Sequence, residues 1–337
     1  MLLRSLLLSS IIAFGSISAA NAYTVGIAMP TQVEDRWYKD GFNLEKMLKN
    51  SGYDVELFYG GDIDVELQKK QIQRLSSANI DVLVVGAIDG TVLADSLKSA
   101  KERHIPVISF DRLISNTDAI SYYATFDNGK VGLMQGQYLI DALKPSVENP
   151  KNIEIFYGSL DDNNAKFFYK EAMKILKPYI DSGALKVLSG ETKPEQTEIK
   201  SWRTDLASKR MDDIMDSVGY SPDSLKLDGI LSPADCISSG IIFTLKKRGY
   251  SLDDMPVITG QDATSDAISN IKEGYQGMTV FKDSNLLCNA VLNMIVALNK
   301  GSSVPVNDNS TYDNGRKVVE SYLCEPKLIT SKNINTL

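Results

Sequence analysis

Six clusters of polar side chains follow apolar, β-rich runs along the sequence, and they share one chemistry. Carboxylates, amides, arginine and lysine recur in them, and the first also holds a tryptophan. The clusters lie at residues 34–37, 110–112, 158–164, 232–235, 259–262 and 281–283. Ligands of open α/β sheets bind beyond the carboxyl ends of the strands, so we expect these clusters to meet at one site.

The residue types favour a ligand that carries hydroxyl groups. A sugar hydroxyl can donate to a carboxylate while it accepts from Arg, Lys or Asn, and hydrogen bonds to charged groups are the stronger ones. The apolar faces of a pyranose need flat, rigid partners, which Trp37 and Trp202 can supply as the two tryptophans of the chain. The set predicts an aromatic-walled pocket for a monosaccharide.

Each residue taken alone also has a simpler explanation. An Asp at a strand end often caps the next helix, and the neighbours Asp111 and Arg112 could form a surface ion pair. Trp37 could pack on a lobe core and Trp202 could anchor a loop. An amino acid is the competing ligand, because its ammonium and carboxylate groups also need opposite charges. The sequence leaves these alternatives open.

Other chemistries fit the sequence poorly. The general acid of a glycosidase needs a raised pKa, whereas Arg112 should lower the pKa of Asp111. Gly129, Gly132 and Gly136 have the spacing of close helix packing and not of a dinucleotide-binding loop. With one histidine and three scattered cysteines, the chain has too few ligands for a typical zinc site and only one candidate base for a Ser-His-Asp triad. We expect no metal site, no cofactor and no catalysed reaction.

The elements that must position the polar clusters alternate between short strands and amphipathic helices. Strands are predicted at residues 24–29, 55–59, 82–87, 107–110, 153–157, 186–188, 229–231, 257–259 and 278–281. The alternation runs twice along the chain, with an extended segment at 122–128 in between, which predicts an α/β protein of two similar, doubly wound parallel-sheet lobes. We expect several chain crossings between the lobes, which would form a hinge and make the groove a clamp.

The amino-terminal residues 1–22 are typical of a secretory signal peptide. Arg4 precedes the apolar run 6–14, and the stretch closes with Ala20-Asn21-Ala22, which predicts cleavage after Ala22. Cleavage would leave 315 of the 337 residues and change the formal charge from −7 to −8. A net negative charge does not favour binding to the phosphate backbone of nucleic acid, so we expect no nucleic-acid partner. We expect an exported protein, most simply in a bacterial periplasm.

The three cysteines do not indicate a disulfide framework. Cys236, Cys288 and Cys324 are odd in number and form no C-x-x-C pair, so buried free thiols are the commoner explanation. A pairing of Cys288 with Cys324 stays open.

Several segments together resemble the periplasmic monosaccharide-binding proteins of ABC transporters, and most of all the xylose-binding and multiple-aldose-binding proteins. The segments that carry the resemblance are residues 35–37, 110–114, 123–128, 162–165, 176–183, 260–263 and 280–282. The resemblance covers essentially the whole mature chain. It implies the type I periplasmic binding protein fold, with an amino-terminal lobe of residues 23–126 and 283–312 and a carboxy-terminal lobe of residues 127–282 and 313–337.

The same resemblance implies a set of ligand-binding residues. Trp37 and Trp202 would pack on the faces of the sugar, and eight residues would hydrogen-bond it: Arg36, Asp111, Arg112, Asp162, Asn164, Asp235, Asp262 and Lys282. One position departs from the xylose-binding pattern, where an Asn stands before the Asp of the seventh cluster and this chain has Ala234. A water or a bulkier ligand substituent could fill that gap.

The resemblance implies a monomeric protein that closes on one aldose and delivers it to an ABC permease in the inner membrane. The alternative is a sensor that presents its sugar-bound form to a chemoreceptor or to a histidine-kinase ectodomain. A transcription regulator on the same lobes would need an amino-terminal helix-turn-helix in place of the signal peptide.

Overall fold

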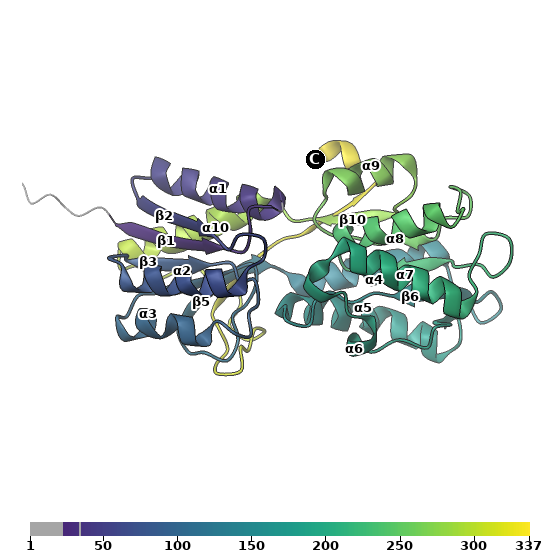
Figure 1. The fold of residues 1–337 in the computed structure, drawn as a ribbon, viewed down its shortest axis with the longest axis horizontal. Helices are drawn as coiled ribbons and strands as arrows, with labels where there is room; N and C mark the ends of the chain where they lie inside the picture. The colour runs from purple at the N-terminus through teal and green to yellow at the C-terminus, as the bar shows by residue number, and fades with distance from the viewer. Residues whose placement is uncertain (1–22, 34) are drawn as a thin grey trace, which may run out of the picture.

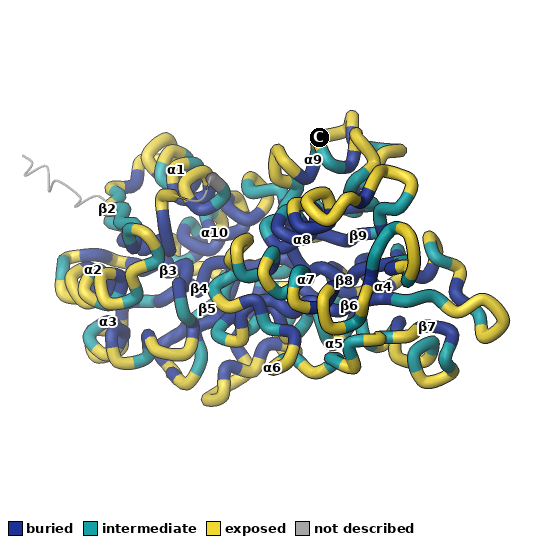
Figure 2. The backbone as a smooth tube through the Cα atoms, turned by 45° about the vertical axis from the view of Figure 1, so that its right-hand side comes forward, coloured by how far each residue is buried: buried dark blue, intermediate teal, exposed yellow. Residues whose placement is uncertain are grey.

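The computed structural model describes residues 23–33 and 35–337 and shows two α/β lobes side by side (Figure 1). The expected signal peptide lies outside the described residues. Strands occur at all nine predicted positions, with ends that differ by up to two residues. In Figure 2 most of the central strands of both lobes are dark blue, whereas the exposed positions lie on the outer helices and the loops. None of the described helices is long and apolar enough to cross a membrane.

The amino-terminal lobe contains a six-stranded, fully parallel sheet in the order β11-β5-β4-β3-β1-β2. The strands are β1 Thr24–Met29, β2 Asp54–Tyr59, β3 Val82–Val85, β4 Val107–Phe110, β5 Ile120–Phe126 and β11 Ser321–Cys324. The helices are α1 Asp35–Asn50, α2 Val65–Ser77, α3 Lys98–Glu102 with the 3-10 turn η1 Ala94–Leu97 before it, and α10 Ser284–Asn299.

Helices cover both faces of this sheet, which explains its continuous apolar strands. Val82 and Val84 of β3 pack in a cluster with α1 and α10, whereas Leu83 and Val85 pack in a second cluster with α2 and α3. Alternate side chains of a strand point to opposite faces, so a strand that is buried on both faces has no polar alternation.

The carboxy-terminal lobe has a four-stranded parallel sheet in the order β7-β6-β8-β9 and an antiparallel pair, β10 with β12. The strands are β6 Lys151–Ile155, β7 Leu185–Lys186, β8 Gly229–Leu231, β9 Val257–Ile258, β10 Met278–Phe281 and β12 Lys327–Thr330. The helices and 3-10 turns are α4 Asn128–Leu143, α5 Asn163–Asp181, α6 Pro194–Thr197, η2 Lys200–Trp202, α7 Thr204–Val218, α8 Asp235–Lys247, α9 Ser265–Glu273 and η3 Ile334–Thr336. The N–H of Val280 donates to the carbonyl of Gly260 at 3.2 Å, so β10 lies next to the chain that leaves β9.

The glycine spacing in α4 serves close packing against α5, as predicted. A Cβ on Gly132 would lie 2.2 Å from the carbonyl oxygen of Phe168, and one on Gly136 would lie 2.9 Å from that of Ala172. Larger residues would force the two helices apart.

The described chain crosses between the lobes three times: from β5 to α4, from β10 to α10 and from β11 to β12. The last crossing corrects the expected division, which assigned residues 313–337 to the carboxy-terminal lobe. Residues 321–324 form β11, which pairs in parallel with β5 in the amino-terminal sheet. This strand has only four residues and begins with a buried serine, and no strand is predicted there from the sequence.

Candidate functional site

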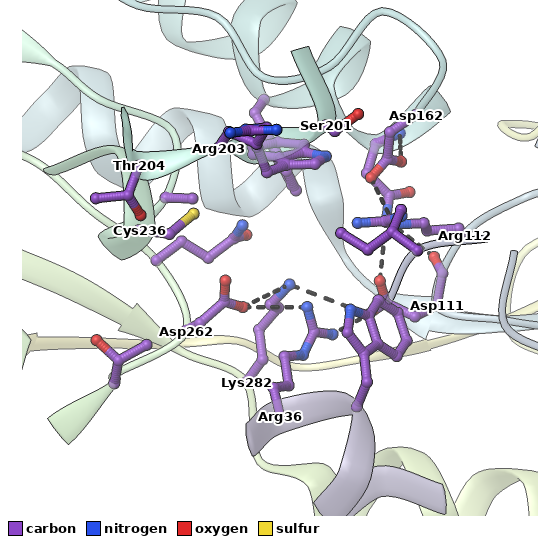
Figure 3. A pocket seen from close by; sticks show the side chains of 18 residues that line it. Arg36, Asp111, Arg112, Asp162, Ser201, Arg203, Thr204, Cys236, Asp262 and Lys282 are labelled. Atoms are coloured by element: carbon purple, nitrogen blue, oxygen red, sulfur yellow. Dashed lines mark hydrogen bonds and ion pairs between the residues drawn. The ribbon is translucent and has the colours of Figure 1, made fainter. Parts of the chain in front are cut away.

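A cavity of about 350 Å³ lies between the lobes (Figure 3). Nine of the ten predicted site residues line it: Arg36, Trp37, Asp111, Arg112, Asp162, Asn164, Trp202, Asp262 and Lys282. They follow the carboxyl ends of strands in both lobes, which agrees with the usual site of ligands in open α/β sheets. The elements therefore bring residues far apart in sequence to one place.

Four of these residues form a charged cluster that spans the two lobes. Arg36 from α1 forms an ion pair with Asp111 after β4, and its Nη1 lies 3.3 Å from Oδ1 of Asp262 in the other lobe. Lys282 Nζ lies 2.9 Å from the same Asp262 oxygen and 4.0 Å from Oδ2 of Asp111. Two cations thus alternate with two carboxylates along one side of the cavity.

A second connection between the lobes runs through Arg112, Asp162 and Asn164. Arg112 Nε lies 2.9 Å from Oδ2 of Asp162, and its Nη1 donates to the carbonyl of Ile88 at 3.0 Å. Asp162 also caps α5 by accepting from the N–H of Asn164 at 2.9 Å. The amide of Asn164 donates to the carbonyl of Asp111 at 2.9 Å and accepts from the Tyr123 hydroxyl at 2.9 Å. The simple cap explanation is therefore true of Asp162 in addition to its place in the cavity.

The cluster keeps Asp111 and Asp262 ionised. Burial raises the pKa of Asp111, but Arg36, Lys282 and Arg112 outweigh it and hold that pKa below its usual value. Burial also opposes ionisation of Asp262, and Lys282 and Arg36 again lower its pKa overall. Both carboxylates are thus hydrogen-bond acceptors at neutral pH.

Asp162 differs from these two carboxylates. Burial raises the pKa of Asp162 more than Arg112 lowers it. Its oxygens remain engaged by Arg112 and by the N–H of Asn164.

The two tryptophans have different environments. Trp37 is 2% exposed within the amino-terminal core, and the guanidinium carbons of Arg36 and Arg112 lie 4.8 and 5.1 Å from its ring centroid. Trp202 is half-buried, meets the Phe168 ring edge to face at 6.4 Å, and has a buried Nε1 without a hydrogen-bond partner. Trp202 thus offers both a flat face and a free N–H donor.

Trp202 also needs a glycine beside it. A Cβ on Gly158 would lie 2.1 Å from the Trp202 ring, so this position admits the indole only because it lacks a side chain.

Strained backbone concentrates at the site. Asp111, Ser201, Trp202, Asp262 and Ala263 all have φ between +51° and +98°. Left-handed backbone is costly for residues other than glycine and clusters at functional sites. At Asp111 the carbonyl receives hydrogen bonds from the Tyr123 hydroxyl, the Thr125 hydroxyl and the Asn164 amide, which together hold the unusual conformation.

Asp235 is the one predicted site residue that does not line the cavity. It is fully buried behind the cavity wall, where its carboxylate accepts from the Thr264 N–H, the Gln276 amide and the Thr279 hydroxyl. The strand-end pattern placed it correctly after β8, but it could not show that the side chain turns into the lobe. Its neighbours Ala234 and Cys236 face the cavity instead.

The remaining lining residues were not among the predicted ligand-binding residues, although the sequence indicated a gap beside the ligand at Ala234. They are Ile63, Phe168, Ser201, Arg203, Thr204, Ala234, Cys236, Gln261 and Thr264. Gln261 lies in the polar cluster at 259–262, and Ser201 and Arg203 flank the predicted Trp202, so their positions in the sequence carried a signal for them. Ile63 and Thr204 lie outside every polar cluster, and no sequence pattern marks them. Cys288 and Cys324 form no disulfide with each other and are both free thiols.

The sequence matches the family model described as periplasmic binding protein domain over residues 25–303. The multiple sugar-binding periplasmic protein of Azospirillum brasilense is 46% identical, with 92% of this chain and 86% of that protein covered. The D-xylose-binding periplasmic protein of Escherichia coli is 33% identical, with 99% and 93% covered.

Solved structures agree with these relatives. An ABC transporter solute-binding protein from Clostridium phytofermentans with bound β-D-glucose has a TM-score of 0.88 and 43% identity, with 93% of this chain and 95% of that chain covered. A carbohydrate transporter solute-binding protein from Chloroflexus aurantiacus in complex with D-glucose has a TM-score of 0.82 and 29% identity, with 93% and 94% covered. With its two lobes, three crossings and interlobe cavity, the chain belongs to the periplasmic binding protein family and has its type I fold.

Proposed function

We propose that this protein is the periplasmic sugar-binding component of an ABC importer and that it binds one aldose in the cavity between the lobes. The observation that carries the proposal is the charged cluster that spans the lobes. In this cluster the cations Arg36 and Lys282 alternate with the carboxylates Asp111 and Asp262. Asp262 Oδ1 lies 2.9 Å from Lys282 and 3.3 Å from Arg36, and Lys282 lies 4.0 Å from Asp111, so donors and acceptors are close enough to bind neighbouring hydroxyl groups of a sugar ring.

The nine lining residues named by the sequence would share the work of binding. The charged and amide side chains would hydrogen-bond the hydroxyl groups, and Trp202 would pack on the ring with its Nε1 free to donate. Trp37 would act mainly by supporting Arg36 and Arg112, because its ring is buried against both guanidinium groups. Asp235 is left out of this set.

The relatives support the wider role. Their names describe periplasmic sugar-binding proteins, and the solved neighbours with bound glucose are solute-binding proteins of transporters. They support our proposal that the protein is exported to the periplasm and delivers the sugar to an inner-membrane permease. Cleavage after Ala22, action as a monomer and the absence of turnover are further parts of the proposal, and cleavage after Ala22 rests on the sequence pattern of residues 1–22. No observation favours the sensor alternative.

A thermal-shift screen tests the proposal. A ligand that binds only the native state raises the melting temperature with concentration, so xylose, glucose, galactose and arabinose are compared with a panel of amino acids. At least one aldose should stabilise the mature protein and no amino acid should. Stabilisation by an amino acid alone would replace the sugar assignment, and loss of the aldose on prolonged incubation would show turnover.

A further inference from the structure

Asp235 has an environment unlike that of the other buried carboxylates at this site. No lysine or arginine of the described chain lies within ion-pair distance of it. Its Oδ2 accepts from the N–H of Thr264 at 3.0 Å and from the hydroxyl of Thr279 at 2.9 Å, and its Oδ1 accepts from the amide of Gln276 at 2.9 Å. One carboxylate at the start of α8 therefore connects three segments: Thr264 just before α9, Gln276 just before β10, and Thr279 within β10.

These bonds hold the turn that presents Asp262. Three consecutive backbone N–H groups point toward β10 and Asp235: Asp262 donates to the carbonyl of Val280 at 2.8 Å, Ala263 to the hydroxyl of Thr279 at 3.1 Å, and Thr264 to Asp235. The hydroxyl of Thr279 accepts from Ala263 and donates to Asp235, so it relays the same attachment. Without these partners a turn with two left-handed residues, at φ +98° and +51°, would relax.

The lobe is also shaped to admit this carboxylate. A Cβ on Gly260 would lie 2.2 Å from Oδ1 of Asp235 and 2.4 Å from Nε2 of Gln276. The chain that leaves β9 can pass here only because residue 260 has no side chain.

We propose that Asp235 is a positioning residue of the sugar site: its carboxylate holds the 262–264 turn in the conformation in which Asp262 meets Arg36 and Lys282. This inference rests on the proposed function, and it goes beyond that function by giving a binding role to a residue that touches no ligand. The role depends on ionisation, because a protonated carboxyl must turn its own O–H toward one of three donors.

The groups around Asp235 decide how its charge responds to pH. Asp262 is the charged group that acts on it most, and burial together with Asp262 raises the pKa of Asp235 to about 7. Lys282 lies beyond Asp262 at the end of β10, and Asp266 in the first turn of α9 is exposed. Helix α4 presents the neutral Gln135, which donates to the carbonyl of Gly260. Sugar affinity should therefore fall as the pH is lowered through about 7.

The experiment compares Asp235→Asn with a matched control in the same lobe, Glu154→Gln. Glu154 is also fully buried and accepts from Ser189 and from the Tyr220 hydroxyl, but it lies outside the cavity. Both variants lose a buried carboxylate of this lobe, so a purely structural effect should be alike. The affinities for D-glucose and D-xylose are measured by calorimetry between pH 5 and pH 8, with unfolding by urea in parallel.

At pH 8 we expect Asp235→Asn to weaken binding of the better sugar by about tenfold or more, the scale of one charged hydrogen bond, and Glu154→Gln by less than about twofold. The difference between Asp235→Asn and the wild-type protein should narrow toward pH 5, where the wild-type carboxyl is protonated. Thr279→Val removes only the hydroxyl that accepts from the N–H of Ala263 and donates to Asp235, so it should weaken binding by a smaller factor. This variant replaces Asp235→Asn in the test if Asp235→Asn does not fold.

Three results would overturn the proposal: an Asp235→Asn or Thr279→Val protein with wild-type affinity, an equal loss in Glu154→Gln, or a loss that does not change with pH. Wild-type protein that binds no aldose would instead overturn the proposed function, and this role of Asp235 with it.

Discussion

Each lobe has a buried aspartate that follows a strand, but the two aspartates have opposite surroundings. In the amino-terminal lobe, Asp111 follows β4 and faces the cavity among Arg36, Arg112 and Lys282. In the carboxy-terminal lobe, Asp235 follows β8 and faces the protein interior among neutral donors. Cations therefore lower the pKa of Asp111, whereas burial raises the pKa of Asp235 to about 7.

The difference separates residues that bind from residues that support. A carboxylate surrounded by cations stays charged and can exchange part of that contact for a sugar hydroxyl. A carboxylate without a cation is costly to bury, so its three neutral donors must all be satisfied and the surrounding turn becomes rigid. Both features can serve one ligand, the first by contact and the second by geometry.

Removal of Asp111 should have the largest effect on binding. Asp111→Asn leaves Arg36 and Lys282 with one carboxylate fewer, and loss of one partner from such a buried group costs about 2–5 kcal/mol. Calorimetry with the best aldose of the thermal-shift screen gives the affinity, and circular dichroism checks the fold. Unchanged affinity in a folded variant would show that Asp111 serves only the scaffold.

The pH dependence of stability should distinguish the two aspartates next. The raised pKa of Asp235 means that the folded state binds its proton more tightly than the unfolded state. Between the unfolded value near 4 and the folded value of about 7, the free energy of unfolding should fall as the pH rises, by at most about 1.4 kcal/mol per unit. The lowered pKa of Asp111 contributes stability that is lost as the pH falls through its folded value.

Urea unfolding from pH 3 to pH 8 measures both effects. Asp235→Asn should reduce the decline between pH 4 and pH 7, and Asp111→Asn should leave the decline in place. The part that survives in Asp235→Asn should come from other buried carboxyl groups such as Asp162 and Glu154, because burial raises the pKa of these groups as well. A decline of the same size in Asp235→Asn and the wild-type protein would contradict the raised pKa of Asp235.

The two tryptophans should separate an effect on sugar affinity from an effect on stability, and the effect on affinity should be smaller than that of Asp111→Asn. Trp202→Ala should weaken the free energy of sugar binding by about 0.5–1.5 kcal/mol more than the loss of buried apolar surface alone would, because the half-buried indole is free to stack on the sugar. Trp37→Ala should instead lower the free energy of unfolding by about 3–5 kcal/mol, because that ring is part of the core. Fluorescence titration and urea unfolding of each variant give the two quantities. Stability loss without affinity loss in Trp202→Ala would remove stacking from the site.

The smallest effect should come from a helix cap whose side chain does not line the cavity. Asp64 caps α2 by accepting from the N–H of Leu67 at 3.0 Å. Asp64→Ala should therefore cost about 0.5–2 kcal/mol of stability and leave sugar affinity unchanged. A change in affinity would show that the stability of one lobe alone influences binding, so that loss of affinity in a variant would no longer identify a residue of the site.

The sequence predicted most of the polar residues that line the cavity, because strand order and strand ends are enough to group them. Parallel strands bring their carboxyl ends to one edge, so Asp111, Asp162 and Asp262 could be grouped without knowledge of their side-chain directions. Direction is what the sequence lacked: Asp235 and Ala234 are neighbours, yet one side chain enters the lobe and the other lines the cavity.

Two further features could not be predicted for physical reasons. The left-handed backbone of Asp111 and Trp202 is imposed by tertiary hydrogen bonds and not by glycine, so local sequence does not mark it. Strand β11 is short and begins with a buried serine, and its partner β5 is distant in sequence. Pairing of this kind depends on tertiary context more than on propensity.

Amide hydrogen exchange with and without the best aldose tests the central claim most directly, namely that one sugar is held by both lobes. The sugar should slow exchange at Asp111 and Arg112 in the amino-terminal lobe and at Trp202, Asp262 and Thr264 in the carboxy-terminal lobe, in proportion to the fraction of protein bound. Protection confined to one lobe, or protection at none of these residues under saturating sugar, would contradict binding between the lobes.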